Sequence, residues 1–259
     1  ALLVRLSGLS RPVMIPDLAS ARPRLEVLAD SLPAVSAHRP PALVLVDGLA
    51  QNVSAFLEAT YDALGTRVRY WGGGAGSLSL TQRPCVFARE GVFQGGAVVA
   101  LTGLAARLGV RHGWQTIRGP IVATRTEGNV IRQLNWRNAF EVYRSLIEGD
   151  MGAPILPEKI FAAAGSYPFG IMKQGAELIV RDPVSVEADG SLVCVGGVPQ
   201  NAALMVLKGI PDKLTEAAGD AARDAVPSEG VVVRHCLLAD CVSRVMFLGY
   251  NPLWYKLFI

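Results

Sequence analysis

The sequence predicts an α/β fold with α+β character, built as two layered halves with mixed sheets. Of the 259 residues, 51% are hydrophobic and 18% are charged, which is the composition of a chain that buries a large core. A β-α-β pattern can be read between residues 42 and 71, and strand-like alternation with hairpin turns returns after residue 120. Because helical and strand patterns mix in both halves, a layered architecture is favoured over a helical bundle or an all-β fold.

The β-α-β unit is the clearest local signal. Residues 42–46 (ALVLV) form a continuous apolar run, which is typical of a strand buried on both faces. Residues 54–64 have helical spacing, and Gly65 is a common kind of helix terminator. A short strand at 68–71 follows, and a crossover of this kind predicts that it runs parallel to the first.

The other elements follow from shorter patterns. Helices are expected at 24–32, 138–147 and 214–225. Strands are expected at 1–8, 85–88, 97–101, 121–126, 129–134, 177–180, 184–186, 192–195, 203–207 and 231–238. We divide the chain into 1–115 and 116–259, and the strand that opens the first half predicts that residues are missing before it.

Composition excludes several protein classes. Mean hydropathy is +0.33, yet no apolar run approaches the roughly 18–20 residues that a membrane-spanning helix needs. The start shows no signal-peptide pattern, so a soluble, cytoplasmic protein is expected. The net charge of +3 is dispersed along the chain, which disfavours a nucleic-acid partner.

The cysteines and other nucleophiles favour a protein without catalysis. Cys85, Cys194, Cys236 and Cys241 form no CxxC pair and are expected to be buried, reduced thiols. Cys241 has no histidine nearby in sequence, no G-x-S-x-G motif occurs, and the carboxylates form no obvious acid–base pair. We therefore predict no enzyme activity, and an uncharacterised hydrolase stays as an alternative.

The glycine cluster Gly72–Gly76 follows a strand, where phosphate-binding loops also occur. It lacks the Lys-Ser/Thr of a P-loop and the GxGxxG spacing. A structural turn and a ligand-facing loop both remain open, since glycine permits positive φ and close backbone approach.

Three histidines could bind a ligand or a metal ion. His38 lies in a proline-rich segment and is expected to be solvated, and His235 lies in an apolar run and is expected to be a core residue. His112 precedes Gly113 and Trp114 between the two halves, and an aromatic-flanked junction is a common ligand site.

These residues carry a resemblance to the FIST family. The N-terminal FIST domain is resembled by Leu45-Val46-Asp47-Gly48-Leu49, Arg69 to Gly76 and Gly91 to Val99. The C-terminal FIST domain is resembled by His112-Gly113-Trp114, Glu127 to Ile131, Ala139 to Tyr143, Tyr167 to Ile171, Val180 to Pro183, Asp189 to Leu192 and Gly197-Val198-Pro199. The segment Asn135-Trp136-Arg137-Asn138 departs from the family, which usually has an acidic-glycine turn there.

The resemblance implies a bacterial sensory module that binds a small ligand, such as an amino acid, and acts without catalytic residues of its own. It implies a signalling partner, such as a histidine kinase, a chemotaxis receptor or a cyclic-di-nucleotide enzyme, and a homo-oligomer is possible. Some members bind haem and sense nitric oxide, so a haem sensor is an alternative in which His112 would be the axial ligand of the iron.

We expect the ligand site near the junction of the halves. Glycines would let the backbone approach the ligand, aromatic rings would supply contact area, and an arginine could pair with a carboxylate. The expected lining residues are Gly73, Gly74, Gly76, His112, Trp114, Tyr167 and Arg181.

Overall fold

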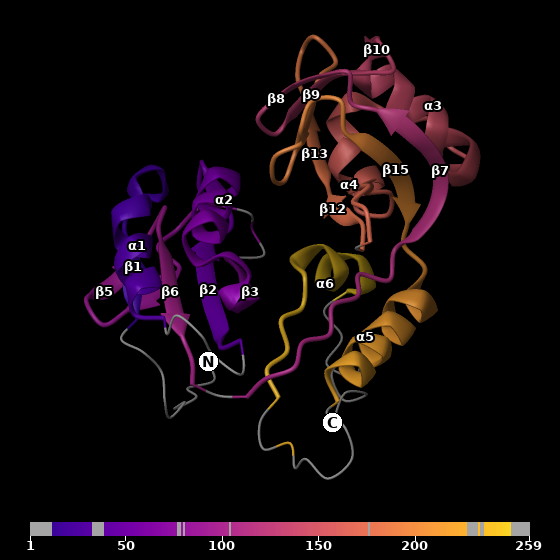
Figure 1. Ribbon diagram of the computed structural model, residues 1–259. Coiled ribbons are helices and arrows are strands. Elements are labelled where there is room, and N and C mark those ends of the chain that lie inside the picture. Colours follow the sequence, from indigo (N-terminus) through magenta and orange to yellow (C-terminus); the bar gives the residue numbers. More distant parts are fainter. Residues whose placement is uncertain are drawn as a thin grey trace. The chain divides into compact units, whose positions relative to one another are not determined.

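The computed structural model describes residues 12–32, 39–76, 79, 81–103, 105–175, 177–226, 233 and 236–249. They belong to two compact units, of which one ends at Leu108 and the other begins at Gly109 (Figure 1). Each unit combines helices with sheets, so the predicted α/β class with mixed sheets is confirmed. The predicted strand at 1–8 lies outside the described residues, as do His38 and His235.

In the part of the first unit that the structure describes, a four-stranded sheet is combined with two α-helices and a separate hairpin. The strand order is β1-β6-β2-β3. Its strands are β1 (Val13–Ile15), β2 (Pro41–Asp47), β3 (Arg69–Ala75) and β6 (Ala97–Leu101), and the hairpin is β4 (Val86–Ala88) with β5 (Gly91–Phe93). Its helices are α1 (Arg22–Asp30) and α2 (Val53–Leu64), with short 3-10 turns η1 (Leu18–Ser20) and η2 (Gly65–Arg67). The β2–β3 pair is parallel, as the β-α-β pattern predicted.

Alternation along the strands explains why α1 and α2 cover one face of this sheet. Val44 and Val46 of β2 belong to the same buried cluster as Leu28 of α1 and Phe56 of α2. Leu45, which lies between the two valines and points to the opposite face, is 39% exposed. The helices are therefore held by one apolar face of the strands, since successive side chains in a strand point to opposite faces.

The glycine run is part of a strand, which corrects the prediction that the strand ends at Trp71. Residues Gly72–Gly74 lie within β3, and Gly76 follows its end. Gly72 has φ +148°, and a Cβ there would collide with the carbonyl oxygen of Val44 in the paired strand. Gly74 is also closely packed, because a Cβ there would lie 3.0 Å from the Gly48 Cα. Gly72 and Gly74 thus permit close backbone packing, whereas Gly73 and Gly76 face open space.

The second unit contains two sheets and four α-helices among the residues described. One sheet has the order β10-β9-β14-β13 with β8 beside β9, and the other has the order β12-β11-β15-β7. Its strands are β7 (Gln115–Val122), β8 (Arg125–Glu127), β9 (Val130–Leu134), β10 (Arg137–Asn138), β11 (Phe169–Ile171), β12 (Ile179–Arg181), β13 (Pro183–Val186), β14 (Leu192–Cys194) and β15 (Ala203–Lys208). Its helices are α3 (Ala139–Met151), α4 (Ile160–Ala164), α5 (Pro211–Ala225) and α6 (Val242–Leu248), with the 3-10 turn η3 (Pro157–Lys159).

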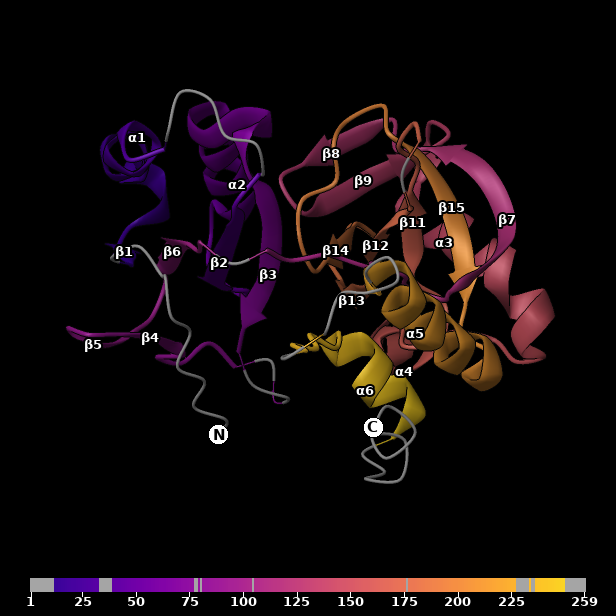
Figure 2. The ribbon, with the colours of Figure 1, turned by 60° about the horizontal axis from the view of Figure 1, so that its bottom comes forward.

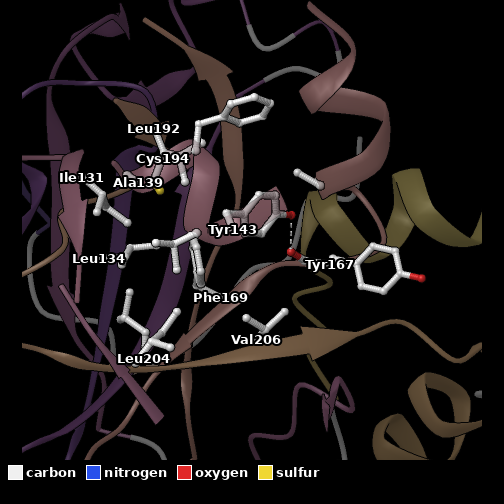
Figure 3. Packing of buried hydrophobic residues seen from close by; sticks show 14 of the residues in the cluster. Ile131, Leu134, Ala139, Tyr143, Tyr167, Phe169, Leu192, Cys194, Leu204 and Val206 are labelled. Carbon is white, nitrogen blue, oxygen red and sulfur yellow. Dashed lines mark hydrogen bonds between the residues drawn. The ribbon is translucent and has the colours of Figure 1, made fainter. Parts of the chain in front are cut away.

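The larger core of this unit lies between the two sheets, α3 and α4. Figure 3 shows Tyr143 of α3 beside Phe169 of β11, and their ring centroids are 5.1 Å apart. The Tyr143 hydroxyl donates a hydrogen bond of 2.7 Å to the Tyr167 carbonyl, which satisfies both groups inside the core. Leu204 and Val206 of β15 reach the same cluster.

A smaller core lies on the opposite face of β15. Leu207 points away from the Leu204 and Val206 side and packs with Trp114 and with Leu214 of α5. Phe247 of α6 joins this second cluster. The β12-β11-β15-β7 sheet is therefore covered on both faces, and α5 and α6 both contribute to the cover of the second one (Figure 2).

Two predictions at the C-terminal end of the chain were wrong. The strand expected at 231–238 is absent at Val233 and over residues 236–238, which have no regular secondary structure, and the remaining positions lie outside the described residues. The burial predicted for all four cysteines holds for Cys194 only, because Cys236 and Cys241 are exposed and Cys85 is partly buried. Cys241 precedes α6, a helix that the sequence pattern did not reveal.

Candidate functional site

The candidate site is a pocket of about 220 Å³ in the second unit. Three segments form it: the chain that enters β7, the loop that enters β12, and the first turns of α5. The lining residues are Arg111, His112, Gly113, Trp114, Gln115, Glu177, Lys213, Glu216, Ala217 and Asp220. Most of them carry a charge or a polar group, so the pocket suits a polar ligand.

Small residues bring the entering chain against α5. Gly109 lies over the backbone of Ala221, where a Cβ would collide with the Ala221 carbonyl. One helical turn away, Gly113 has φ +79°, and a Cβ there would lie 2.7 Å from the Ala217 Cβ. Gly109 and Gly113 thus lie against residues that are one helical turn apart in α5.

Glu177 holds the wall of the pocket in place. Its Oε2 accepts a hydrogen bond of 3.2 Å from the His112 backbone N–H and lies 3.2 Å from His112 Nε2. Its Oε1 accepts a bond of 3.4 Å from Arg111 Nη1. Arg111 continues to Asp224 of α5 through a 2.7 Å ion pair. One carboxylate thus ties the loop before β12 to the chain that enters β7.

His112 is held in its neutral form. Its Nδ1 accepts a hydrogen bond of 2.9 Å from the Trp114 backbone N–H, so Nδ1 carries no proton. The ring proton therefore sits on Nε2, which faces Glu177. Burial lowers the pKa of His112 and Arg244 lowers it further, whereas Glu177 opposes both effects.

Both basic and acidic side chains line the pocket. Its lining includes two basic side chains, Arg111 and Lys213, and three acidic ones, Glu177, Glu216 and Asp220. Lys213 Nζ contacts Glu216 at 2.7 Å, and both side chains are about half exposed, so this surface pair costs little to rearrange. Side chains of both signs at the rim can meet a ligand that carries both an ammonium and a carboxylate group.

The structure brings two of the predicted site residues together and leaves five elsewhere. His112 and Trp114 line the same pocket, although Trp114 is only 4% exposed. The Tyr167 hydroxyl donates to Asp150 at 2.6 Å, and burial raises the pKa of Tyr167 to about 12. Arg181 Nε donates to the Gly197 carbonyl at 2.8 Å. Gly73, Gly74 and Gly76 belong to the first unit.

Sequence reasoning missed Glu177 and Lys213. Glu177 is 65 positions from His112, and Lys213 lies in the first turn of α5, where a charged residue is unremarkable. No local pattern in the sequence connects either residue with His112.

The surroundings of His112 do not fit haem. Iron ligation through Nε2 would move the ring proton to Nδ1, which already accepts the Trp114 N–H. Ligation through Nδ1 would remove that hydrogen bond. A haem ring also needs a deep apolar slot, whereas this pocket is small and lined by charged side chains. Among the described residues, no group of three His, Cys, Asp or Glu side chains could hold a metal ion.

Comparison with known proteins gave two family matches. The family model described as the FIST N domain matches residues 7–137, and the FIST C domain matches residues 139–253. The change of unit after Leu108 precedes the change of family model, and the division predicted at 115–116 falls between the two. No curated protein and no solved structure matched the chain. In the part of the chain that the structure describes, no helix has the length and apolarity to cross a membrane.

Proposed function

Because this chain belongs to the FIST family, whose domains are associated with sensory signal transduction, we propose that it binds a small charged molecule in the His112 pocket and thereby regulates a signalling partner. The partner class that the family suggests is a histidine kinase, a chemotaxis receptor or a cyclic-di-nucleotide enzyme of a bacterium. The observation that carries the ligand site is the pocket, in which charged side chains from three segments surround a neutral, half-buried histidine.

Size and charge define the ligand class. Pockets for drug-sized ligands occupy roughly 300–1,000 Å³, so a pocket of about 220 Å³ suits something smaller. A zwitterion such as an amino acid would place its ammonium group near Glu177 or Asp220 and its carboxylate near Lys213. Each contact replaces a surface ion pair of the free protein, and exposed pairs of this kind contribute little to stability.

In the proposed function, the protein binds its ligand without catalysing a reaction on it. The exposed thiol of Cys241 lies 3.5 Å from the Ser243 hydroxyl, which donates to Asp182 at 2.7 Å. Among the residues that the structure describes, no histidine side chain joins these contacts, and His112 is engaged with Glu177 and Trp114. A broad ester and amide hydrolysis screen tests this point, and turnover abolished by Cys241→Ala would contradict it.

The binding proposal is tested by thermal shift with a panel of amino acids and related zwitterions. A ligand present at 100 times its Kd should stabilise the fold by about 2.7 kcal/mol. Lys213→Met should abolish the shift, because the carboxylate of the ligand loses its partner. Lys173→Met is the matched control, since Lys173 is exposed and does not line the pocket. The proposal fails if no panel member shifts the wild type, or if both variants respond alike.

Haem is tested separately by the absorption spectrum of the protein as isolated and after haem titration. The geometry at His112 predicts that no histidine-ligated Soret band depends on this residue. A band present in the wild type and lost in His112→Ala would overturn that expectation and favour a haem sensor. Retention of the band in His112→Ala would indicate that another residue binds the haem iron.

A further inference from the structure

We propose that α6 reports the occupancy of the His112 pocket, because it is anchored on two residues that line this pocket, His112 and Trp114. The inference rests on the proposed function, since it concerns how a ligand at that site would be read out. Three side chains of α6 make the contacts that carry it: Ser243, Arg244 and Phe247.

Arg244 joins α6 to the backbone of His112. Its side chain is only 8% exposed, and its Nη1 donates to the His112 carbonyl at 3.5 Å. Its Nε lies 3.0 Å from Asp240, but without the geometry of a hydrogen bond, so Nε is left without a hydrogen-bond partner. A buried guanidinium with an incomplete set of partners is costly to hold. The docked position of Arg244 is therefore sensitive to the place of the His112 carbonyl.

Phe247 joins α6 to Trp114. The two ring centroids are 5.4 Å apart and the ring planes are inclined by 59°. Both rings close over Gly209, where a Cβ would lie 2.6 Å from Phe247 and 2.7 Å from Trp114. Such packing leaves little empty space around the two rings, so a movement of Trp114 requires a movement of Phe247.

Ser243 provides an anchor away from the pocket. Its hydroxyl donates to Asp182 at 2.7 Å, in the chain between β12 and β13. This contact involves no residue that lines the pocket. It can therefore hold one end of α6 while the contacts of Arg244 and Phe247 change.

Glu177 is the point at which a ligand would act. In the free protein this carboxylate holds the His112 backbone N–H, faces His112 Nε2 and holds Arg111. An ammonium group that binds Glu177 competes with these donors, so the chain at 111–112 is held less firmly when the pocket is filled. A ligand shifts an equilibrium only when it contacts the two states differently, and Glu177 supplies that difference. Filling the pocket therefore weakens the docking of α6 through the His112 carbonyl and Trp114.

The test uses hydrogen–deuterium exchange of the full chain, with pocket variants as the perturbation. Glu177→Gln removes the charge that holds residues 111–112, and we expect the amides of α6 to exchange about tenfold faster, within the roughly 5–150-fold range of coupling between sites. Glu216→Gln is the matched control, because it neutralises a carboxylate of the same pocket that does not touch residues 111–112. The amides of β9 report whether the fold itself has loosened.

A reverse arm completes the experiment. Phe247→Leu, which keeps an apolar side chain, should speed exchange at residues 111–115, because coupling between two sites acts in both directions. Faster α6 exchange in Glu177→Gln with unchanged β9 exchange supports the proposal. Unchanged α6 exchange alongside faster exchange at 111–115, or an equal response to Glu216→Gln, overturns it. Neither result depends on finding a ligand, so the failure of the binding proposal is recorded separately by the thermal-shift panel.

Discussion

Replacing Gly113 with alanine should open the pocket from its α5 side. The added Cβ would lie 2.7 Å from the Ala217 Cβ, 2.9 Å from the Leu214 Cα and 3.0 Å from the Lys213 carbonyl oxygen. Two of these three atoms belong to the backbone of α5, so no flexible side chain can absorb the clash. The chain at 111–115 must move away from the helix, and the contacts of His112 with it.

The magnitude follows from two separable effects. Positive φ at residue 113 costs an alanine about 1–2 kcal/mol, and forcing an extra methyl into a packed contact costs about 1–3 kcal/mol. Gly128→Ala is the matched control, because Gly128 has φ +59° and nothing within 4 Å of the added Cβ. The control carries the backbone strain and the change in unfolded-chain entropy. The difference between the two variants is therefore the packing cost alone, about 1–3 kcal/mol.

Urea unfolding of the full chain measures both variants. A second substitution sharpens the result: Ala217→Gly should partly rescue Gly113→Ala, because it removes the nearest of the three atoms. The rescue is read against Ala217→Gly alone, which loses up to about 1 kcal/mol of helix propensity. If Gly113→Ala and Gly128→Ala lose equal stability, the close approach of this chain to α5 is refuted.

Three further predictions concern single side chains. Burial raises the pKa of Asp182 above its ordinary value of 3.8, so the folded state holds the proton of this carboxyl more tightly than the unfolded chain does. The free energy of unfolding should therefore fall as the pH rises from 3.8 through the raised pKa. Asp182→Asn should remove this pH dependence in urea unfolding, and an unchanged pH profile in the variant would contradict the argument. Trp136 is 77% exposed at φ +60° in the β9–β10 turn, so Trp136→Gly should raise the melting temperature through about 1 kcal/mol of relieved strain, and a fall would refute the strain argument. Tyr143→Phe should cost about 1–2 kcal/mol, because the buried Tyr167 carbonyl loses its donor; Tyr61→Phe, at an exposed position, is the control that should cost much less in the same assay.

Local elements were predictable where the periodic pattern was long. The run 42–46 and the helix at 54–64 correspond to β2 and α2, and the parallel partner of β2 followed from the crossover. The glycine run after Trp71 was misread, because glycine is common in turns and only the carbonyl of Val44 shows why a strand needs it there. The short helix α6 escaped notice, since its seven residues hold too few turns to show a period.

The candidate site, like the fold, has features that the sequence predicts and features that only the tertiary structure decides. The sequence by itself determined the family, the mixed α/β class and the choice of His112 and Trp114 as candidate ligand-site residues. Each of these depends on neighbouring residues or on their order along the chain. Tertiary structure alone decided that Glu177 contacts His112 and that Lys213 lines the same pocket. These residues are 65 and 101 positions away from His112 in the sequence, and the folding of the chain around β12 and α5 brings them to the site. The tertiary structure also decided the chemical state of His112. The neutral ring results from burial, from a backbone N–H that donates to Nδ1 and from the nearby charge of Arg244. Burial and contacts between distant residues cannot be predicted from the local sequence.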